Sequence, residues 1–375
     1  MTITLNPDVL RHVVDVHCHP TDAGEVSQLE MDKLEITICA MSSMKSDQQR
    51  VAALAQANPD KVIPCFGRTL STESKGSYHP WFSHLIRLES TTSKEEHYRK
   101  LLLHDTAQTK LEEHTQIFNR LLPTLPDPIP LSEVLDELRS NLTMHPGAMV
   151  GEVGLDRVFR MPYDYFAEKR QLTPFTIPLE HQLAILEAQV DVAVELKRNV
   201  SIHSVKSQQA TLDLLRKLAQ RHGDDWYRIS IDMHSCGFSP ETWRDTEKAF
   251  SNVFVSLSTV INHKHSSLTR LIDMCSPDRI LAESDYNNVE MCTPQVLQII
   301  ELIAEVKGWR IEEEWVEELE EAKWGAVRRL AENWKRFKKG GHPPPTRTLS
   351  KRARKKQLLD SSSEAGSSQG GDGAP

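Results

Sequence analysis

Eight short runs rich in Val, Ile and Leu are distributed along the chain, and most of the segments between them are long enough to form helices. Polar or turn residues bound each run, as they bound β-strands. The runs lie at residues 13–19, 35–41, 62–67, 148–156, 199–204, 228–235, 253–259 and 279–285. Strands that alternate with helices pair in parallel, and a closed parallel barrel needs eight of them. The sequence therefore predicts an α/β fold, a (β/α)8 TIM barrel.

The spacing of apolar residues predicts helices between these runs. Residues 178–199 carry apolar side chains at steps of three and four, which is the spacing of one helix face. Residues 311–337 show the same spacing, and seven glutamates between Glu312 and Glu321 precede the Arg and Lys residues of this segment. That order of charges suits the helix dipole. We therefore expect one long final helix, with these glutamates on a solvent-exposed face.

Two stretches exceed what a minimal barrel needs. Residues 86–146, between the third and fourth runs, contain helical patterns and a proline-rich stretch, so we expect an elaborated insert within a barrel domain of residues 1–337. Residues 338–375 are basic and then rich in Ser and Gly, which predicts a disordered tail. Its KRARKK segment at 351–356 resembles a nuclear-localisation signal, although a solubilising basic tail explains it equally well.

Charge and composition restrict the partners and the compartment. The chain has 375 residues and a net charge of −8, but residues 1–337 alone carry 37 basic and 50 acidic residues. An acidic body repels a polyanion, so nucleic-acid binding would need a local basic groove or bound cations. No run is long enough to span a membrane, the amino end lacks a signal-peptide pattern, and the six cysteines form no CxxC pair. We expect a soluble protein of the cytoplasm, the nucleus or both.

Histidine and acidic residues fall at the ends of the predicted strands. They are His17 and His19 in the first run, Glu152 in the fourth, His203 in the fifth, His234 in the sixth and Asp285 in the eighth. Because side chains alternate along a strand, His17 and His19 should point together into the barrel, with Asp15 beside them and Cys18 facing the helices. Barrel enzymes place their chemistry at the carboxyl ends of the strands. We therefore expect these residues to form one site at the barrel mouth.

This combination of four imidazoles and two carboxylates predicts a metal centre. Burying such groups without a partner is costly, and divalent cations would compensate them. Imidazole and carboxylate suit zinc, manganese or iron, and one shared carboxylate can bridge two ions about 3.5–4 Å apart. Such ions bring the pKa of bound water close to about 7. The prediction is a site for two divalent metal ions (Mg, Mn or Zn) that supports hydrolysis by an activated water.

Several motifs resemble those of the TatD family of metal-dependent deoxyribonucleases. The family's D-x-H-x-H, G-E-x-G-L-D and E-T-D motifs are similar to DVHCHP, GEVGLD and AESD of this chain, and its two single-histidine strands are similar to SIH and DMH. LAENWKRF resembles the family's closing N-x-x-R-x-F pattern. The resemblance covers roughly residues 13–337. It implies the same barrel fold and a metal-dependent phosphodiesterase.

The resemblance also implies roles for individual residues. One metal ion would be held by His17, His19 and Asp285, the other by His203 and His234, and Glu152 would bridge them. Asp285 and Glu152 would be the catalytic residues, with Asp285 orienting or deprotonating the water. The reaction implied is 3′-to-5′ exonucleolytic cleavage of DNA. Fungal proteins of this kind are also described as partners in a cell-cycle complex, so the resemblance allows a protein partner.

The positions expected to contact substrate depart from the family pattern. Ser204-Val205 stands where Cys-Arg is usual, with a cation only at Lys206, and residues 68–77 separate Gly67 from the His79-Pro80 pair as an insertion would. We consider His79, Arg157 and Lys206 as candidates for binding a substrate phosphate. Two alternatives stay open: a barrel hydrolase of another ester or amide, and a regulatory protein on this scaffold. Related amide hydrolases often carry a modified lysine where Glu152 stands, which favours phosphoester or ester chemistry.

Overall fold

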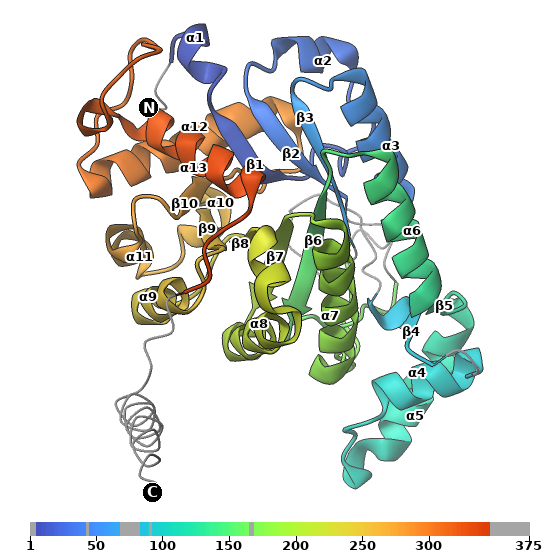
Figure 1. Ribbon diagram of the computed structural model, residues 1–375. Coiled ribbons are helices and arrows are strands. Elements are labelled where there is room, and N and C mark those ends of the chain that lie inside the picture. The colour runs from blue at the N-terminus through green and yellow to red at the C-terminus, as the bar shows by residue number, and fades with distance from the viewer. Residues whose placement is uncertain (1–4, 43–44, 68–82, 90–91, 165–168, 346–375) are drawn as a thin grey trace, which may run out of the picture. The chain divides into compact units, whose positions relative to one another are not determined.

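A computed structural model describes residues 5–42, 45–67, 83–89, 92–164 and 169–345. Its main feature is an eight-stranded sheet in which every pair of neighbours is parallel (Figure 1). In order, the strands are β1 (Val14–Cys18), β2 (Thr37–Met41), β3 (Val62–Phe66), β6 (Met149–Asp156), β7 (Val200–Val205), β8 (Ile231–Met233), β9 (Val253–Leu257) and β10 (Ile280–Ala282). Each predicted run therefore contributes one strand.

Backbone hydrogen bonds beyond the strand ends join the first strand to the last. The N–H of Asp285 donates to the His17 carbonyl (2.9 Å), and the N–H of His19 donates to the Tyr286 carbonyl (2.8 Å). The Ser284 N–H donates to the Asp15 carboxylate (2.8 Å). The sheet thus nearly closes as a barrel, which confirms the predicted (β/α)8 fold.

Helices surround the sheet and bury its outer face. Those that follow barrel strands are α2 (Gln28–Lys33), α3 (Lys45–Ala57), α7 (Leu179–Leu196), α8 (Gln208–His222), α9 (Pro240–Ala249), α10 (Thr259–Asn262), α11 (Leu268–Met274), α12 (Val289–Lys307) and α13 (Ala326–Lys339), and α1 (Pro7–Leu10) precedes the sheet. The largest hydrophobic cluster lies between strands and helices. A second cluster, which includes Val16, Cys39 and Leu281, alternates with it along the strands and fills the barrel interior.

The connection between β3 and β6 is an elaborated insert, as predicted. It contains the short strands β4 (Ile86–Arg87) and β5 (Ile129–Pro130), which pair in parallel, and the helices α4 (Lys94–Leu102), α5 (Leu111–Leu121) and α6 (Leu131–Met144). Tyr98, Leu101 and Phe118 of the insert pack with Phe159 and Phe175, which follow β6, in a hydrophobic cluster of their own. The insert is therefore a folded part of the barrel domain.

The long final helix predicted for residues 311–337 is wrong in its first half. Helix α13 begins at Ala326, and residues 311–325 contain only a short 3-10 turn at Glu321–Lys323. The Glu312 carboxylate is buried and accepts hydrogen bonds from the N–H groups of Gly325 (2.8 Å), Val327 (3.0 Å) and Arg328 (3.2 Å). The first N–H groups of a helix have no partner within it, and Glu312 supplies one. Glu312 is thus not on an exposed helix face.

The ordered chain continues past Phe337. Helix α13 ends at Lys339, and the ring of His342 is buried with its Nε2 atom 2.7 Å from Ser230 Oγ. The compact unit that contains the barrel ends at Pro343. Among the described residues, no helix has both the length and the hydropathy of a membrane span. Residues 68–82, which include His79, and residues 346–375, which include KRARKK, lie outside the described residues.

Candidate metal centre

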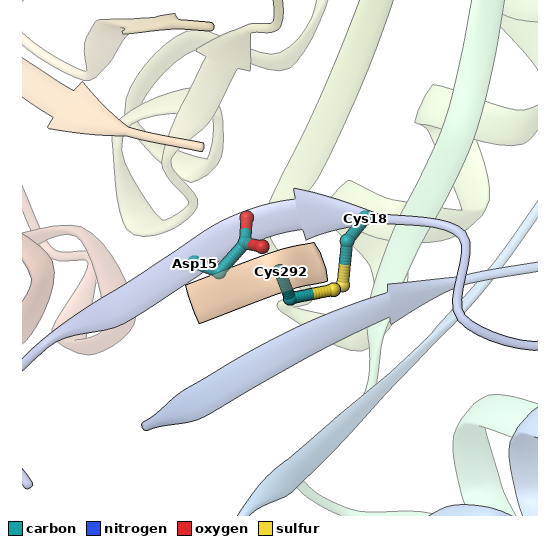
Figure 2. Close-up of side chains that lie close together, drawn as sticks. All are labelled: Asp15, Cys18 and Cys292. Carbon is teal, nitrogen blue, oxygen red and sulfur yellow. The ribbon is translucent and has the colours of Figure 1, made fainter. Parts of the chain in front are cut away.

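An irregularity in β1 decides which of its side chains reach the barrel mouth. Asp15 lies opposite Ile38 of β2, and Cys18 lies opposite Ala40, so β1 advances three residues where β2 advances two. Such a bulge places an extra residue in β1 and leaves Asp15 and Cys18 on the same side. Figure 2 shows Asp15 and Cys18 beside Cys292 of α12, and their polar atoms lie within 4.8 Å of one another.

The prediction that Asp15 points into the barrel beside the histidines is therefore wrong. Strict alternation fails at the bulge, so Asp15 lies with Cys18 and Cys292 instead. Its carboxylate still has a role at the mouth, because it accepts the N–H groups of Ser284 (2.8 Å) and His17 (3.3 Å). Burial raises the pKa of Asp15 to about 7. Asp15 therefore links the ends of β1 and β10 without belonging to the ligand group.

All six residues predicted to bind metal meet at the barrel mouth. Their potential ligand atoms form three overlapping groups, each within 4.8 Å: His17 with His19 and Glu152; Glu152 with His203 and His234; His17 with His234 and Asp285. Glu152 belongs to two of these groups, which is the position that a bridging carboxylate would occupy.

The two oxygens of Glu152 face different histidines. Its Oε1 atom lies 2.7 Å from His203 Nδ1 and 3.3 Å from His234 Nε2, whereas its Oε2 atom lies 3.7 Å from His19 Nε2. His19 Nε2 also lies 3.5 Å from Asp285 Oδ1. The carboxylate of Glu152 thus stands between the histidines of β7 and β8 and the pair that ends β1.

A second layer of polar residues orients the histidines. Ser201 Oγ donates to Asp232 (3.1 Å) and lies 2.8 Å from His17 Nδ1, so it accepts the Nδ1 proton and leaves the His17 Nε2 lone pair facing the centre. His234 Nδ1 lies 3.2 Å from Glu283 Oε1 in the same way. Sequence reasoning missed these supports. The available signal was position, because Asp232 and Glu283 each stand two residues before a predicted ligand, in DMH and ESD.

Burial and mutual charge shift the pKa values of the ligand group. Burial lowers the pKa of His17 well below its ordinary value, and the neighbouring His234 lowers it further. Burial also opposes the charge on Glu152, but His203 and His234 outweigh it and hold the pKa of that carboxyl well below its usual range. Burial, together with the charges of Glu283 and Glu152, raises the pKa of Asp285 to about 6, although the neighbouring histidines lower it. Near neutral pH the centre therefore offers two ionised carboxylates and the neutral imidazole of His17.

Four potential ligand atoms at the centre make no well-oriented hydrogen bond to the described part of the chain. Both oxygens of Glu152, His203 Nε2 and His19 Nδ1 are buried, and none has a well-oriented hydrogen bond within the described part of the chain. Unpaired buried polar groups are destabilising, and a cation placed among them would satisfy several at once. Nitrogen and carboxylate oxygen donors are a set that divalent transition metals accept. The residues present therefore fit a divalent metal centre.

Two backbone features hold the strand ends in this arrangement. A Cβ atom on Gly154 would overlap the backbone carbonyl of His203, so only glycine permits the close approach of β6 and β7 that brings Glu152 to His203. Three residues that follow strands at the mouth, Lys206, Ser235 and Asp285, have left-handed φ angles of 51°, 41° and 50°. Such conformations are uncommon outside glycine and persist only where the surroundings impose them.

The predicted substrate contacts are less well supported than the ligands. Arg157 and Lys206 are exposed and directly follow β6 and β7, but neither lines the cavity of about 220 Å³ that opens beside the centre. His203, His234 and Asp285 do line this cavity. His79 lies outside the described residues.

Two further basic residues line that cavity and were missed by sequence reasoning. Lys264 and His265 follow β9, in the NHKH segment. The signal that could have identified them is their position after the seventh barrel strand, on the mouth side of the barrel.

Fold and site together define the class: a hydrolase-type (β/α)8 barrel with a candidate metal centre at the carboxyl ends of its strands. A model of the TatD-related DNase family matches residues 14–330. The chain therefore belongs to the TatD family and is a hydrolase of that family.

Individual relatives agree with this assignment. The chain is 30% identical over 344 residues to the Cut9-interacting protein scn1 of Schizosaccharomyces pombe, a match that covers 81% of this chain and 95% of scn1. It is 29% identical over 341 residues to the uncharacterized deoxyribonuclease YMR262W of Saccharomyces cerevisiae, covering 88% and 99% of the two chains. The crystal structure of YJJV, a TatD homologue from Escherichia coli, shares the fold with a TM-score of 0.51 and 16% identity over 89% of this chain and 100% of YJJV.

Proposed function

We propose that this protein is a metal-dependent phosphodiesterase that degrades DNA from the 3′ end. The observation that carries the proposal is the place of Glu152, whose oxygens are shared between two groups of histidines at the barrel mouth. The family description and the name of the budding-yeast relative, a deoxyribonuclease, support DNA as the substrate.

Each predicted ligand has a defined task in this proposal. His17, His19 and Asp285 would hold one divalent ion, His203 and His234 the other, and Glu152 would contact both. Two ions held there would supply a hydroxide near neutral pH and stabilise charge on the phosphoryl oxygens. Ser201 and Glu283 keep the Nε2 atoms of His17 and His234 turned inward.

In this proposal Asp285 handles the proton of the attacking water. Its carboxylate lines the mouth cavity together with His203 and His234, and it lies beside His19. Asp285 would orient the water and accept its proton as the water oxygen attacks phosphorus. The bond from phosphorus to the 3′ oxygen breaks, and the departing oxygen takes up a proton, so the reaction conserves atoms and charge.

The direct test is hydrolysis of end-labelled single-stranded DNA with Mg²⁺, Mn²⁺ or Zn²⁺. The wild type is compared with a His17→Ala, His19→Ala double variant and with His222→Ala, which changes a histidine at the end of α8. We expect the wild type and His222→Ala to shorten the DNA from the 3′ end in a metal-dependent way, and the double variant to leave it intact. A folded, metal-loaded wild type that leaves DNA intact would refute the proposal and favour hydrolysis of another ester or amide.

A second candidate role is binding of a protein partner in a cell-cycle complex. The observation that favours it is the name of the fission-yeast relative, which describes a protein that interacts with Cut9. Capture of the counterpart of Cut9 by both the wild type and the inactive double variant would support this role. Failure of both to bind the purified counterpart would argue against it.

We further propose that the basic tail directs the protein to the nucleus. The support is the KRARKK sequence at residues 351–356. Because His342 packs into the barrel domain, the tail is best removed after Pro345 and not after Phe337. Truncation there should reduce nuclear accumulation and leave hydrolysis unchanged. Unaltered distribution in cells would identify the tail as a solubilising segment.

A further inference from the structure

The mouth cavity brings a lysine and a further histidine next to the ligand group. Lys264 and His265 come from the segment between α10 and α11, and they line the same cavity as His203, His234 and Asp285. At about 220 Å³ the cavity is smaller than the roughly 300–1,000 Å³ of drug-sized ligand sites. It would therefore hold one part of a larger substrate next to the metal centre.

Lys264 adds an ammonium group to a cavity that the carboxylates of Asp156 and Asp285 also line, in a protein whose body is acidic. Lys264 makes no ion pair with another described residue. Burial and then the charge of Lys206 lower the pKa of His265, so near neutral pH its imidazole is neutral and can donate a hydrogen bond. An ammonium group that has no carboxylate partner attracts an anion, and more strongly where protein partly excludes water. The arrangement favours an anionic ligand at this wall of the cavity.

The segment that carries Lys264 and His265 is fixed to the residues that follow β8, next to His234. Asn262 is buried, and its side-chain amide donates to the carbonyls of Ser235 and Cys236 (both 3.2 Å), just after β8. The Asn262 carbonyl in turn accepts the N–H of His265 (2.8 Å). The backbone that carries Lys264 and His265 is thus anchored beside the metal centre, and both residues are exposed.

An apolar wall completes the cavity. Val158, Val260 and Ile261 line it, and Val158 is 53% exposed although it is hydrophobic. A phosphate would contact Lys264 and the metal centre, and an organic group attached to it would contact the apolar wall. A phosphodiester has both parts.

We propose that Lys264 and His265 bind the phosphate of the substrate and select an anionic phosphodiester over a neutral ester. This inference rests on the proposed function and assigns it a specificity site. One non-bridging phosphate oxygen faces Lys264 and His265, and the sugar next to the phosphate packs against Val158, Val260 and Ile261. Charge-assisted hydrogen bonds of this kind are the stronger ones in proteins.

The test compares two chromogenic substrates on the metal-loaded protein: bis(p-nitrophenyl) phosphate, which is an anionic phosphodiester, and p-nitrophenyl acetate, which is a neutral ester. The variants are Lys264→Ala, Lys264→Arg and the control Lys248→Ala, at the end of α9 that leads into β9 and away from the mouth. We expect Lys264→Ala to lower the ratio of kcat/KM for the phosphodiester to that for the neutral ester about 10- to 100-fold. Lys264→Arg should restore most of the ratio, and Lys248→Ala should not change it.

A binding measurement separates this inference from the proposed function. The affinity of the protein for a short fluorescein-labelled single-stranded DNA is measured by anisotropy in EDTA, where no hydrolysis occurs. Lys264→Ala should weaken it and reduce its dependence on salt. Phosphodiester cleavage by the wild type with no loss in Lys264→Ala would overturn the inference and leave the function standing. A wild type that cleaves no phosphodiester would refute the function, and equal DNA affinity of the wild type and Lys264→Ala would then refute the inference as well.

Discussion

Two buried glutamates show how differently this protein treats a carboxylate in its interior. Glu312, at the amino end of α13, is 2% exposed and accepts hydrogen bonds from three backbone N–H groups. Glu152, at the barrel mouth, is 0% exposed, and neither of its oxygens accepts a well-oriented hydrogen bond within the described residues. Its neighbours are the imidazoles of other predicted ligands.

The difference separates a structural carboxylate from one retained for chemistry. A buried charge that serves stability is surrounded by donors, because an unpaired one is destabilising. Glu312 meets that requirement with the unpaired N–H groups of a helix end. Glu152 does not, and a cation is the partner that would complete its surroundings. The comparison therefore predicts that one glutamate controls activity and the other controls stability.

The largest effect is expected for Glu152→Gln. The substitution keeps the shape of the side chain and removes the shared charge, so turnover should fall by about 1,000-fold or more while the fold is retained. Added Mn²⁺ should stabilise the wild type by about 3 kcal/mol at a hundredfold excess over Kd, and it should stabilise the variant much less. Hydrolysis assays, circular dichroism and thermal unfolding with and without metal check this. A fully active Glu152→Gln protein would break the comparison.

A smaller effect, on stability and not on activity, is expected for Glu312→Gln. The amide keeps an acceptor oxygen but loses the charge that favours the helix end, so the free energy of unfolding should drop by about 1–2 kcal/mol. Activity of the folded protein should be unaltered. The matched control is Glu313→Gln, because Glu313 is the exposed neighbour and should change stability little. Denaturant unfolding of both variants measures this, and equal stabilities would show that the Glu312 contacts contribute nothing.

The smallest effect concerns the partly buried His181, whose Nε2 atom is within hydrogen-bond distance of a backbone carbonyl. Burial lowers the pKa of His181 to about 4, although its Nε2 lies 2.8 Å from the Ser83 carbonyl. In the unfolded chain this pKa returns to about 6.5, so between these values the unfolded chain binds a proton that the folded chain does not. Stability should therefore rise with pH across this window and be lost as pH falls through it.

The change due to His181 should amount to about 1 kcal/mol. His181→Gln, compared with the wild type in EDTA so that pH-dependent metal binding does not contribute, should flatten the pH dependence of the unfolding free energy between about pH 4 and 6.5. A variant with an unchanged slope would place the acid sensitivity elsewhere in the molecule. The burial of His84, whose pKa is lowered to about 3, acts in the same direction and would remain.

Local pattern was sufficient to predict the barrel and the residues that gather at its mouth. Strand and helix periodicities depend on the residues themselves, and the carboxyl ends of parallel strands lie at one rim. Residues as distant as His17 and Asp285 can therefore be grouped from the sequence. The insert could also be predicted, because residues 86–146 are longer than a normal connection between two barrel strands.

Other features depended on contacts between segments that are distant in sequence. The bulge in β1 moved Asp15 out of the ligand group, because register depends on the neighbouring strand. Glu312 was assigned to a helix face, but the N–H groups that it satisfies belong to the start of α13. Lys264 and His265 carry no motif of their own, and only folding places them beside His203 and His234.

The sequence by itself thus determined the barrel and which chemical groups its strand ends carry, since both follow from local periodicity and strand direction. The tertiary structure alone decided which of those groups have partners, because hydrogen-bond satisfaction is a property of the surroundings. That is why Glu152 and Glu312, the same residue type and both buried, have different roles in this protein.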